Sequence, residues 1–260
     1  YPGVVDRYVN MGDCYDKEGL AVRRQEIMSC MTGYKGCYQR AYRCLGASAE
    51  IFEDVRSTLL TDVLGEKLAK RAHGILSREF KKRKGVQSGQ VKQRFLGAVT
   101  HKGAMTLFDT ATAQCSRIYE LVDSYGLAHE LLVHILAGGA AGGYDIVACP
   151  DPMAPDRLAH LLVPELGLAF LTSTSVLPFP GSPYRRIRLD AAADREILRH
   201  SRPRLRFAKK VSAALAEEAV ESLAQAKAMH DDLEALYHPY VNFELVGETA
   251  LAIAAELSLL

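Results

Sequence analysis

Strand-like and helix-like segments alternate between residues 94 and 178, and this alternation limits the possible folds more than any other feature of the sequence. Each segment is assigned from its apolar periodicity and from the turn residues around it. In chain order we predict a strand at 118–122, a turn at 123–129, a helix at 130–137, a loop at 138–143, and strands at 145–149 and 166–171. A strand, a helix and a second strand form a βαβ unit, which implies a parallel sheet. We therefore expect an α/β fold.

The turn after the first of these strands is the default place for a ligand. Ligands of parallel α/β sheets bind beyond the carboxyl ends of the strands. The turn and the start of the helix read Asp-Ser-Tyr-Gly-Leu-Ala-His-Glu at residues 123–130. Because a strand, a glycine-containing turn and a helix occur together in many proteins, the pattern by itself assigns no ligand.

The two ends of the chain resemble each other at a constant offset. Tyr1-Pro2-Gly3 recurs as Phe179-Pro180-Gly181, and at the same spacing of 178 residues Asp16 matches Asp194. A shared order of turn, extended segment and long helices indicates a duplicated unit.

The duplication predicts how the chain is divided. We expect residues 1–92 to form the helical C-terminal part of a truncated first repeat plus a linker, and residues 93–260 to form the second repeat. On this hypothesis the block at 94–178 has lost its counterpart upstream of Tyr1, and the natural protein holds roughly 350 residues.

Both copies are predicted to be mainly helical. In the first copy apolar residues recur at steps of three or four, which is the period of an amphipathic helix. Helices are expected at 18–60, 62–80, 194–236 and 243–260, after short extended segments at 7–11 and 185–189. Pro203 is expected to break the third helix early, because proline lacks an N–H and clashes with the preceding turn.

Several short segments together resemble a known protein family. They are Phe-Leu-Gly-Ala-Val-Thr-His-Lys-Gly at 95–103, Tyr-Glu-Leu at 119–121, Cys-Pro-Asp-Pro at 149–152, Val-Pro-Glu-Leu at 163–166, Arg-Ala-Tyr-Arg at 40–43 and the helix at 226–233. The family is a little-characterised group of bacterial proteins with two tandem P-loop NTPase-like repeats, often labelled ATPase or nucleotide-kinase-like. The resemblance covers nearly the whole chain. It implies a P-loop NTPase-like, three-layer parallel sheet with long helical hairpins, and a first P-loop upstream of Tyr1.

In that family the turn is a phosphate-binding loop, G-x-x-x-x-G-K-[S/T], whose backbone N–H groups and lysine hold phosphate. The resemblance places this loop on Ser124, Tyr125, Gly126, Leu127, Ala128, His129 and Glu130. Asp123 and Ala128 stand where the family has its two glycines. His129 replaces the lysine and Glu130 the Mg²⁺-binding hydroxyl, while Thr172 replaces an acidic residue after the third strand. These changes predict a degenerate loop that hydrolyses nothing.

The resemblance therefore implies a fragment of a tandem P-loop ATP-binding protein, an ATPase whose catalysis lies in the missing repeat. ATP is the implied nucleotide, Mg²⁺ belongs to an intact upstream repeat, and no catalytic residue or metal ligand is assigned in this chain. Tyr125, Gly126 and His129 are expected to touch a nucleotide only weakly, His129 only when protonated. The alternative is a non-catalytic scaffold or protein-interaction module that packs against the missing repeat or a second copy.

Three patterns suggest metal or nucleic-acid sites but have simpler explanations. His129 and His134 resemble a zinc-protease motif, yet a spacing of five places them ~140° apart on a helix. His230-Asp231-Asp232 is interpreted as an exposed acidic helix face. The run Lys-Lys-Arg-Lys at 81–84 is interpreted as a solvated linker, which argues against an RNA-binding module.

Composition narrows the classes of protein to which the chain can belong. The formal net charge is +1 and 48% of the residues are hydrophobic, which excludes a disordered tail and a polybasic nucleic-acid binder. The six cysteines include no C-x-x-C pair and are interpreted as buried, reduced thiols. Prolines interrupt the weakly charged stretch at 158–184, so we expect no membrane span and a cytoplasmic protein.

Overall fold

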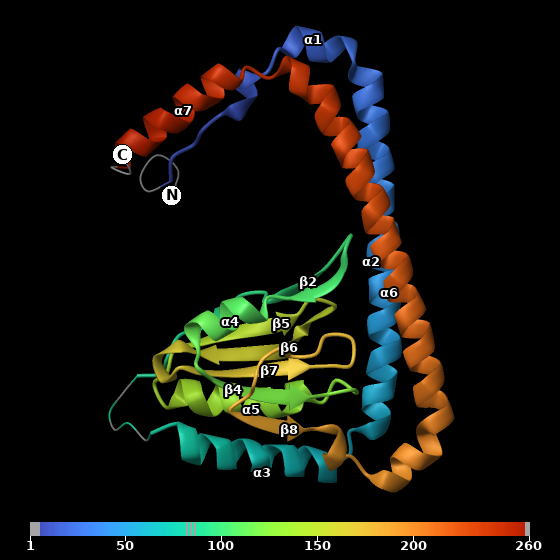
Figure 1. Ribbon diagram of the computed structural model, residues 1–260, viewed down its shortest axis with the longest axis vertical. Helices are drawn as coiled ribbons and strands as arrows, with labels where there is room; N and C mark the ends of the chain where they lie inside the picture. Colours follow the sequence, from blue (N-terminus) through green and yellow to red (C-terminus); the bar gives the residue numbers. More distant parts are fainter. Residues whose placement is uncertain (1–5, 82, 84, 86, 258–260) are drawn as a thin grey trace. The chain divides into compact units, whose positions relative to one another are not determined.

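The computed structural model describes residues 6–81, 83, 85 and 87–257, which fall into two compact units. One unit is residues 41–221, and the other joins the segment ending at Arg40 to the segment starting at Ser222. Two long helices, α2 (Arg24–Leu59) and α6 (Arg195–Tyr237), contribute to both units (Figure 1). The predicted repeat boundary at residue 92 stays a prediction, and its anchor Tyr1-Pro2-Gly3 lies outside the described residues.

A six-stranded sheet is the centre of the unit 41–221 (Figure 1). In sheet order its strands are β1 (Val91–Gln93), β5 (Ile146–Asp151), β6 (Ala154–Val163), β7 (Leu168–Ser173), β4 (Arg117–Val122) and β8 (Arg185–Arg188). The β1–β5, β7–β4 and β4–β8 pairs are parallel, and β6 is antiparallel to both of its neighbours. The expected α/β class is therefore confirmed, whereas the sheet, expected to be parallel, is only mostly parallel because of β6.

The predicted βαβ unit is present, but its two strands are not neighbours. β4 and β5 run in the same direction and are linked by α5 (Ala128–Ala141), yet β6 and β7 lie between them. The strand β6 was not predicted; its Pro155 and Asp156 are exposed, and its last four residues are buried. Because β6 follows β5 directly in the chain, it pairs with β5 as an antiparallel hairpin and occupies the place beside β5 in the sheet.

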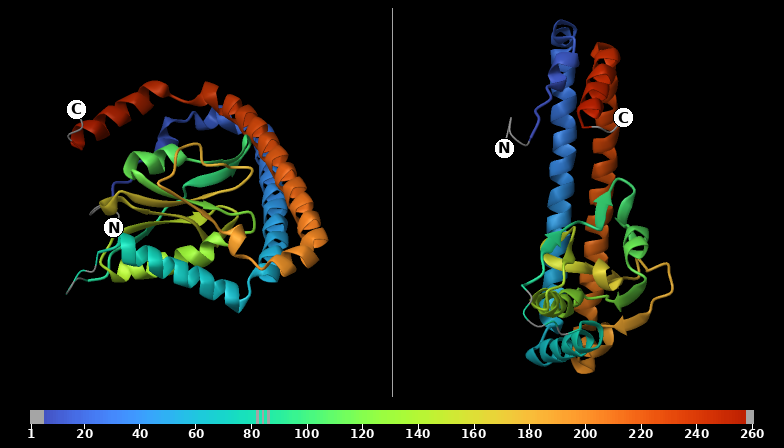
Figure 2. Two further views of the ribbon diagram at one scale, coloured as in Figure 1. Left: turned by 60° about the horizontal axis from the view of Figure 1, so that its bottom comes forward. Right: turned by 90° about the vertical axis from the view of Figure 1, so that its left-hand side faces the viewer.

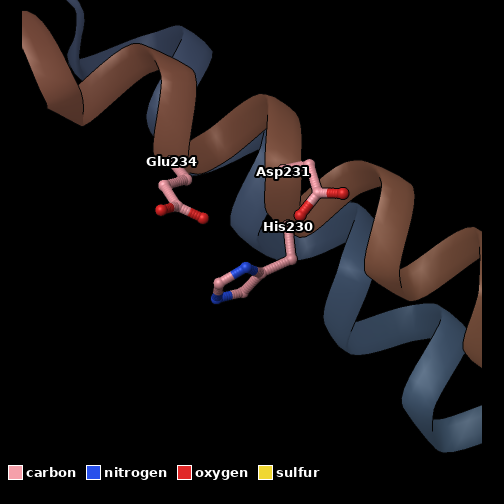
Figure 3. A group of neighbouring side chains, drawn as sticks. All are labelled: His230, Asp231 and Glu234. Carbon is pink, nitrogen blue, oxygen red and sulfur yellow. The ribbon is translucent and has the colours of Figure 1, made fainter.

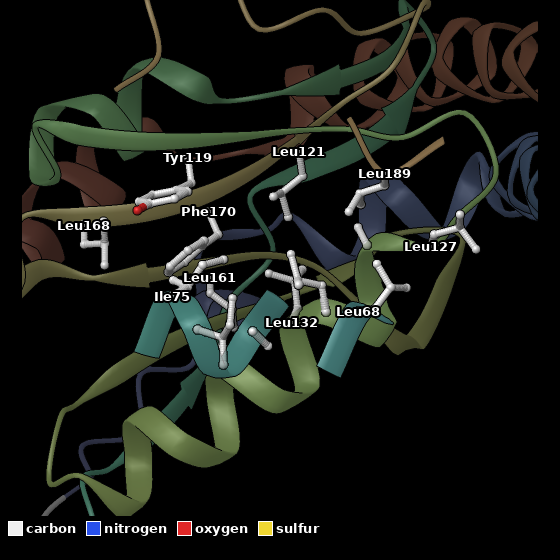
Figure 4. Packing of buried hydrophobic residues seen from close by; sticks show 14 of the residues in the cluster. Leu68, Ile75, Tyr119, Leu121, Leu127, Leu132, Leu161, Leu168, Phe170 and Leu189 are labelled. Atoms are coloured by element: carbon white, nitrogen blue, oxygen red, sulfur yellow. The ribbon is translucent and has the colours of Figure 1, made fainter. Parts of the chain in front are cut away.

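One face of the sheet is covered by α3 (Asp62–Glu79) and α5 (Figures 1 and 4). Side chains alternate across a strand, so Tyr119 and Leu121 of β4 point to this face while Ile118 points to the other. Each fully buried leucine in this cluster contributes roughly 2 kcal/mol. The largest core of the molecule therefore lies directly beneath β4, the strand that leads into the candidate loop.

The opposite face is covered by α4 (Phe108–Gln114) and lies beside a hairpin of β2 (Gly97–Thr100) and β3 (Gly103–Thr106). Phe108 packs edge-on against Phe179 and His160 of β6. Helices thus lie on both faces of the sheet, although α4 has only seven residues.

The helix after the loop is longer than expected. Residues 138–141, predicted as a loop, continue α5. The cause is close packing: a Cβ on Gly139 would come within 2.8 Å of both Ile146 and Phe80. The glycine is therefore needed for the approach of neighbouring elements and does not end the helix.

The helix α6 is not broken at Pro203, which corrects the sequence-based expectation. In the unit 41–221 its first half packs against the second half of α2 (Figure 2), with the Ser48 and Ser212 hydroxyl oxygens 2.6 Å apart. Buried contacts of Val55 and Leu59 with Ala208 hold the two helices together, so the loss of one backbone hydrogen bond at proline is tolerated.

The other unit is helical in its described part. It contains α1 (Lys17–Val22), α7 (Phe243–Glu256) and the adjoining halves of α2 and α6. Asp16 caps α1 and Asp194 caps α6, as expected for the two helix starts. The segment 7–11 is not a strand: residues 7–10 have no regular structure and Met11 begins a 3-10 turn, whereas 185–188 is the strand β8. Among the described residues no helix is both long enough and apolar enough to span a bilayer.

Candidate functional site: the loop after β4

The loop from Asp123 to Leu127 joins β4 to α5 at the carboxyl end of β4. Gly126 has φ +73°, a left-handed conformation that glycine adopts without strain. The ring of Phe52 packs beside this position, where a Cβ would meet it at 3.4 Å, an ordinary van der Waals contact, so glycine is favoured here by its φ. The loop is therefore shaped by packing against α2 as well as by its own turn.

The carboxylate of Asp123 occupies the inside of this loop. Asp123 is 3% exposed, and its two oxygens accept hydrogen bonds from the backbone N–H of Tyr125 at 3.0 Å and of Ala128 at 2.7 Å. Burial raises the pKa of Asp123, while the backbone donors act in the opposite direction. A phosphate-binding loop uses such N–H groups to hold its ligand. Here a side chain of the same chain has taken them.

The other backbone donor at the start of the loop is also engaged. The N–H of Ser124 donates to the Oδ1 of Asp190 at 2.9 Å. Tyr125 is partly buried between the core beneath the sheet and the contact of α2 with α6, and burial raises the pKa of its hydroxyl. Leu127 is fully buried. Three of the predicted loop residues thus serve the packing of this unit.

His129 acts as a hydrogen-bond acceptor. Its Nδ1 accepts the backbone N–H of Leu158 at 2.9 Å, so this nitrogen carries no proton. Burial, followed by the charge of Arg157, lowers the pKa of His129. A ring held neutral in this way cannot supply the cation that lysine gives a phosphate loop.

Two arginines reach the loop, but two glutamates neutralise them. Arg56 of α2 pairs with Glu130 at 3.0 Å and also with Glu53. Arg157 of β6 donates to the carbonyl oxygen of Gly126 at 2.6 Å and lies 3.8 Å from both glutamates. The cluster carries no net charge. Sequence analysis found Glu130 and missed both arginines, which have no motif and lie 74 and 27 residues from it.

The hydroxyl of Thr172, the residue expected just after the third strand, already has a hydrogen-bond partner. Thr172 lies in β7, beside Leu121 of β4. Its Oγ1 donates to the carbonyl oxygen of Ala159 at 2.5 Å, and its N–H donates to the Nδ1 of His160. Burial lowers the pKa of His160 to about 4. The N–H groups of Ser124, Tyr125 and Ala128 and the hydroxyl of Thr172 thus already have partners within the chain and are not available to ATP or Mg²⁺ in this arrangement.

Other sequence patterns lie away from this loop. His230, Asp231 and Glu234 present ligand atoms within 4.8 Å of one another on exposed α6 (Figure 3), but Lys227 donates to both oxygens of Asp231. Arg83 pairs with Glu165 and stacks on Tyr144 at 3.9 Å; residues 82 and 84 of the basic run lie outside the described residues.

The cysteines and the second histidine of the false zinc motif also have ordinary surroundings. Cys14, Cys37, Cys115 and Cys149 are buried free thiols. Cys30 and Cys44 were also expected to be buried, but they are only partly buried. His134 is exposed and faces His73, at 6.1 Å between ring centroids, while His129 is bound to β6. The two histidines therefore face different neighbours.

Comparison with known proteins finds no matching family model, no matching curated protein and no matching solved structure.

Proposed function

We propose that this chain is a non-catalytic interaction module built on a P-loop-like α/β domain. The observation that carries the proposal is the self-occupied loop: Asp123 takes the N–H groups of Tyr125 and Ala128 that a nucleotide phosphate would need. In a tandem P-loop ATP-binding protein, such a domain leaves hydrolysis to another repeat and contributes packing surface to it or to a second copy.

The charge balance around the loop supports the same proposal. Arg56 and Arg157 lie beside Gly126 and Glu130 of the loop region, and Glu53 and Glu130 neutralise them. A bound triphosphate would have to break these pairs and displace the buried Asp123 carboxylate. Breaking the pairs leaves the glutamates without their partners, and displacing Asp123 exposes the two N–H groups that it binds, so both steps oppose binding.

Calorimetric titration with Mg·ATP tests the proposal. We expect no binding to the loop tighter than roughly 1 mM, about 4 kcal/mol, and no ATP hydrolysis above that of buffer. The control is the variant Arg202→Gln/Arg206→Gln, which removes cations from a separate surface on α6. ATP binding below 1 mM that persists in this variant would contradict the proposal.

A further inference from the structure

A second surface of the unit 41–221 is strongly cationic, unlike the neutral ion cluster beside the loop. It is a groove of about 550 Å³ between the end of α2, the outer side of the loop after β4 and the first half of α6. Five of its lining residues are cationic: Arg195, Arg199, Arg202, Arg206 and Lys209. No carboxylate is among the described residues that line it.

The five cations form a regular stripe along α6. They follow one another at steps of four, three, four and three residues, so they share one face of the helix. At 1.5 Å per residue the stripe is about 21 Å long. That length exceeds what a single triphosphate needs and suits an extended anion.

The stripe differs from the rest of the helix in its pairing. Among the residues that the structure describes, Arg195, Arg202, Arg206 and Lys209 take part in no ion pair, and Arg199 reaches the exposed Glu196 only at 3.9 Å. Arg204, on the opposite face of α6, is paired with Asp54. Like charges concentrated in a groove repel one another and attract anions from solution. Stability does not explain this arrangement, whereas anion binding does.

Two aromatic rings extend the groove beyond the cations. Phe52 and Tyr125 are partly exposed and line the same groove. Aromatic side chains beside a basic track are the usual means of holding single strands, because each base can stack on a ring while the phosphates contact the cations. Four of the five cations are arginine, whose planar group matches phosphate in a bidentate manner.

We propose that this groove binds single-stranded nucleic acid, with the stripe on the phosphates and Phe52 or Tyr125 against bases. The groove shares Ser124 and Tyr125 with the outer side of the loop, whereas the carboxylate of Asp123 fills the inside. The inference does not depend on the absence of nucleotide binding inside the loop. A net charge of only +1 hides the site, because acidic residues elsewhere in the chain balance the stripe.

Fluorescence anisotropy with a labelled oligouridylate of about 12 nucleotides, within the range of single-strand sites, tests the proposal. Five phosphate contacts predict a slope of about −3.5 in log affinity against log salt, an affinity loss of about 100-fold between 50 and 200 mM salt. Arg202→Gln/Arg206→Gln should reduce the slope to about −2. Phe52→Leu should weaken binding about tenfold at unchanged slope.

The matched control is Arg43→Gln/Arg71→Gln, which removes the same charge from exposed positions on α2 and α3 outside the groove. It should leave the slope near that of the unchanged chain. Equal losses in the two double variants, or no binding of the oligouridylate at 50 mM salt, would overturn the proposal. Inorganic polyphosphate and polyglutamate of similar charge serve as competitors: if either displaces the oligouridylate at equal charge concentration, the bases contribute nothing and the assignment to nucleic acid is wrong.

Discussion

The loop after β4 and the stripe on α6 belong to the same unit, yet the cations beside the loop are paired with carboxylates and those of the stripe are not. At the loop, Arg56 and Arg157 are paired with Glu53 and Glu130, and the backbone donors are bound to Asp123. On the stripe, arginines such as Arg202 and Arg206 have no ion-pair partner among the described residues. The loop, which is where this type of sheet usually holds an anion, has its N–H groups bound to Asp123. The stripe on α6 matches no sequence motif, yet its cations are unpaired among the described residues. Position in the fold does not determine function; the partners of each side chain do.

The largest effect is expected at the centre of the closed loop. Asp123→Ala removes the acceptor of two buried N–H groups, so the free energy of unfolding should fall by about 4 kcal/mol in urea denaturation. Asp190→Ala, which removes only the acceptor of the Ser124 N–H, should cost less than about 1 kcal/mol. Similar losses for the two variants would show that Asp123 does not hold the loop closed.

Acid should lower the stability of the unit that holds the closed loop, through the buried His160 of β6. The pKa of His160 is about 4 in the folded chain and about 6.5 when unfolded, so the unfolded chain takes up the proton first. The contribution of the neutral His160 to the free energy of unfolding is therefore fully present above pH 6.5. It falls by about 3 kcal/mol as the pH drops to 4. His160→Gln should abolish this part of the pH dependence; an unchanged profile would refute the assignment.

The ion cluster beside the loop should contribute a smaller amount. Glu130→Gln leaves Glu53 as the ion-pair partner of Arg56 and Arg157 among the described residues, and thermal or urea unfolding should show a loss of about 2 kcal/mol. Glu66→Gln is the matched control, because Glu66 makes only an exposed pair with Lys70 and should change stability by less than about 0.5 kcal/mol. A loss at Glu130 no larger than that control would mean that the cluster is not structural.

The smallest effect on stability is expected on the stripe itself. Arg202→Gln/Arg206→Gln breaks no ion pair of the described residues and should alter the free energy of unfolding by less than about 0.5 kcal/mol. A loss above 1 kcal/mol in urea denaturation would indicate that these arginines stabilise the fold, and the contrast between the two regions would disappear.

Much of the α/β core could be predicted because its pattern is local. The apolar run at Ile118–Val122 identifies β4, and Asp16 and Asp194 identify two helix starts. The strand β6 was missed because its pattern changes along its length, from exposed Pro155 and Asp156 to a buried end. The helical path through Pro203 depends on packing with α2, which no local window contains.

Only part of the candidate site could be predicted from the sequence. Asp123 and Glu130 were recognised as carboxylates in an unsuitable place for phosphate, and the structure adds the hydrogen bonds through which Asp123 fills that place. Arg56 and Arg157 reach the loop from other elements and carry no signal in the sequence. The stripe on α6 has a helical period that can be read directly, but its lack of partners is a tertiary property.

The most direct test of this contrast follows both regions in one titration. In an NMR titration with the oligouridylate, the backbone amide of Ala128 reports on the closed loop, and the guanidinium groups of Arg202 and Arg206 report on the stripe. The account predicts saturable shifts of the two guanidinium groups and none of the Ala128 amide. A shift of the Ala128 amide with the guanidinium groups unchanged would contradict it.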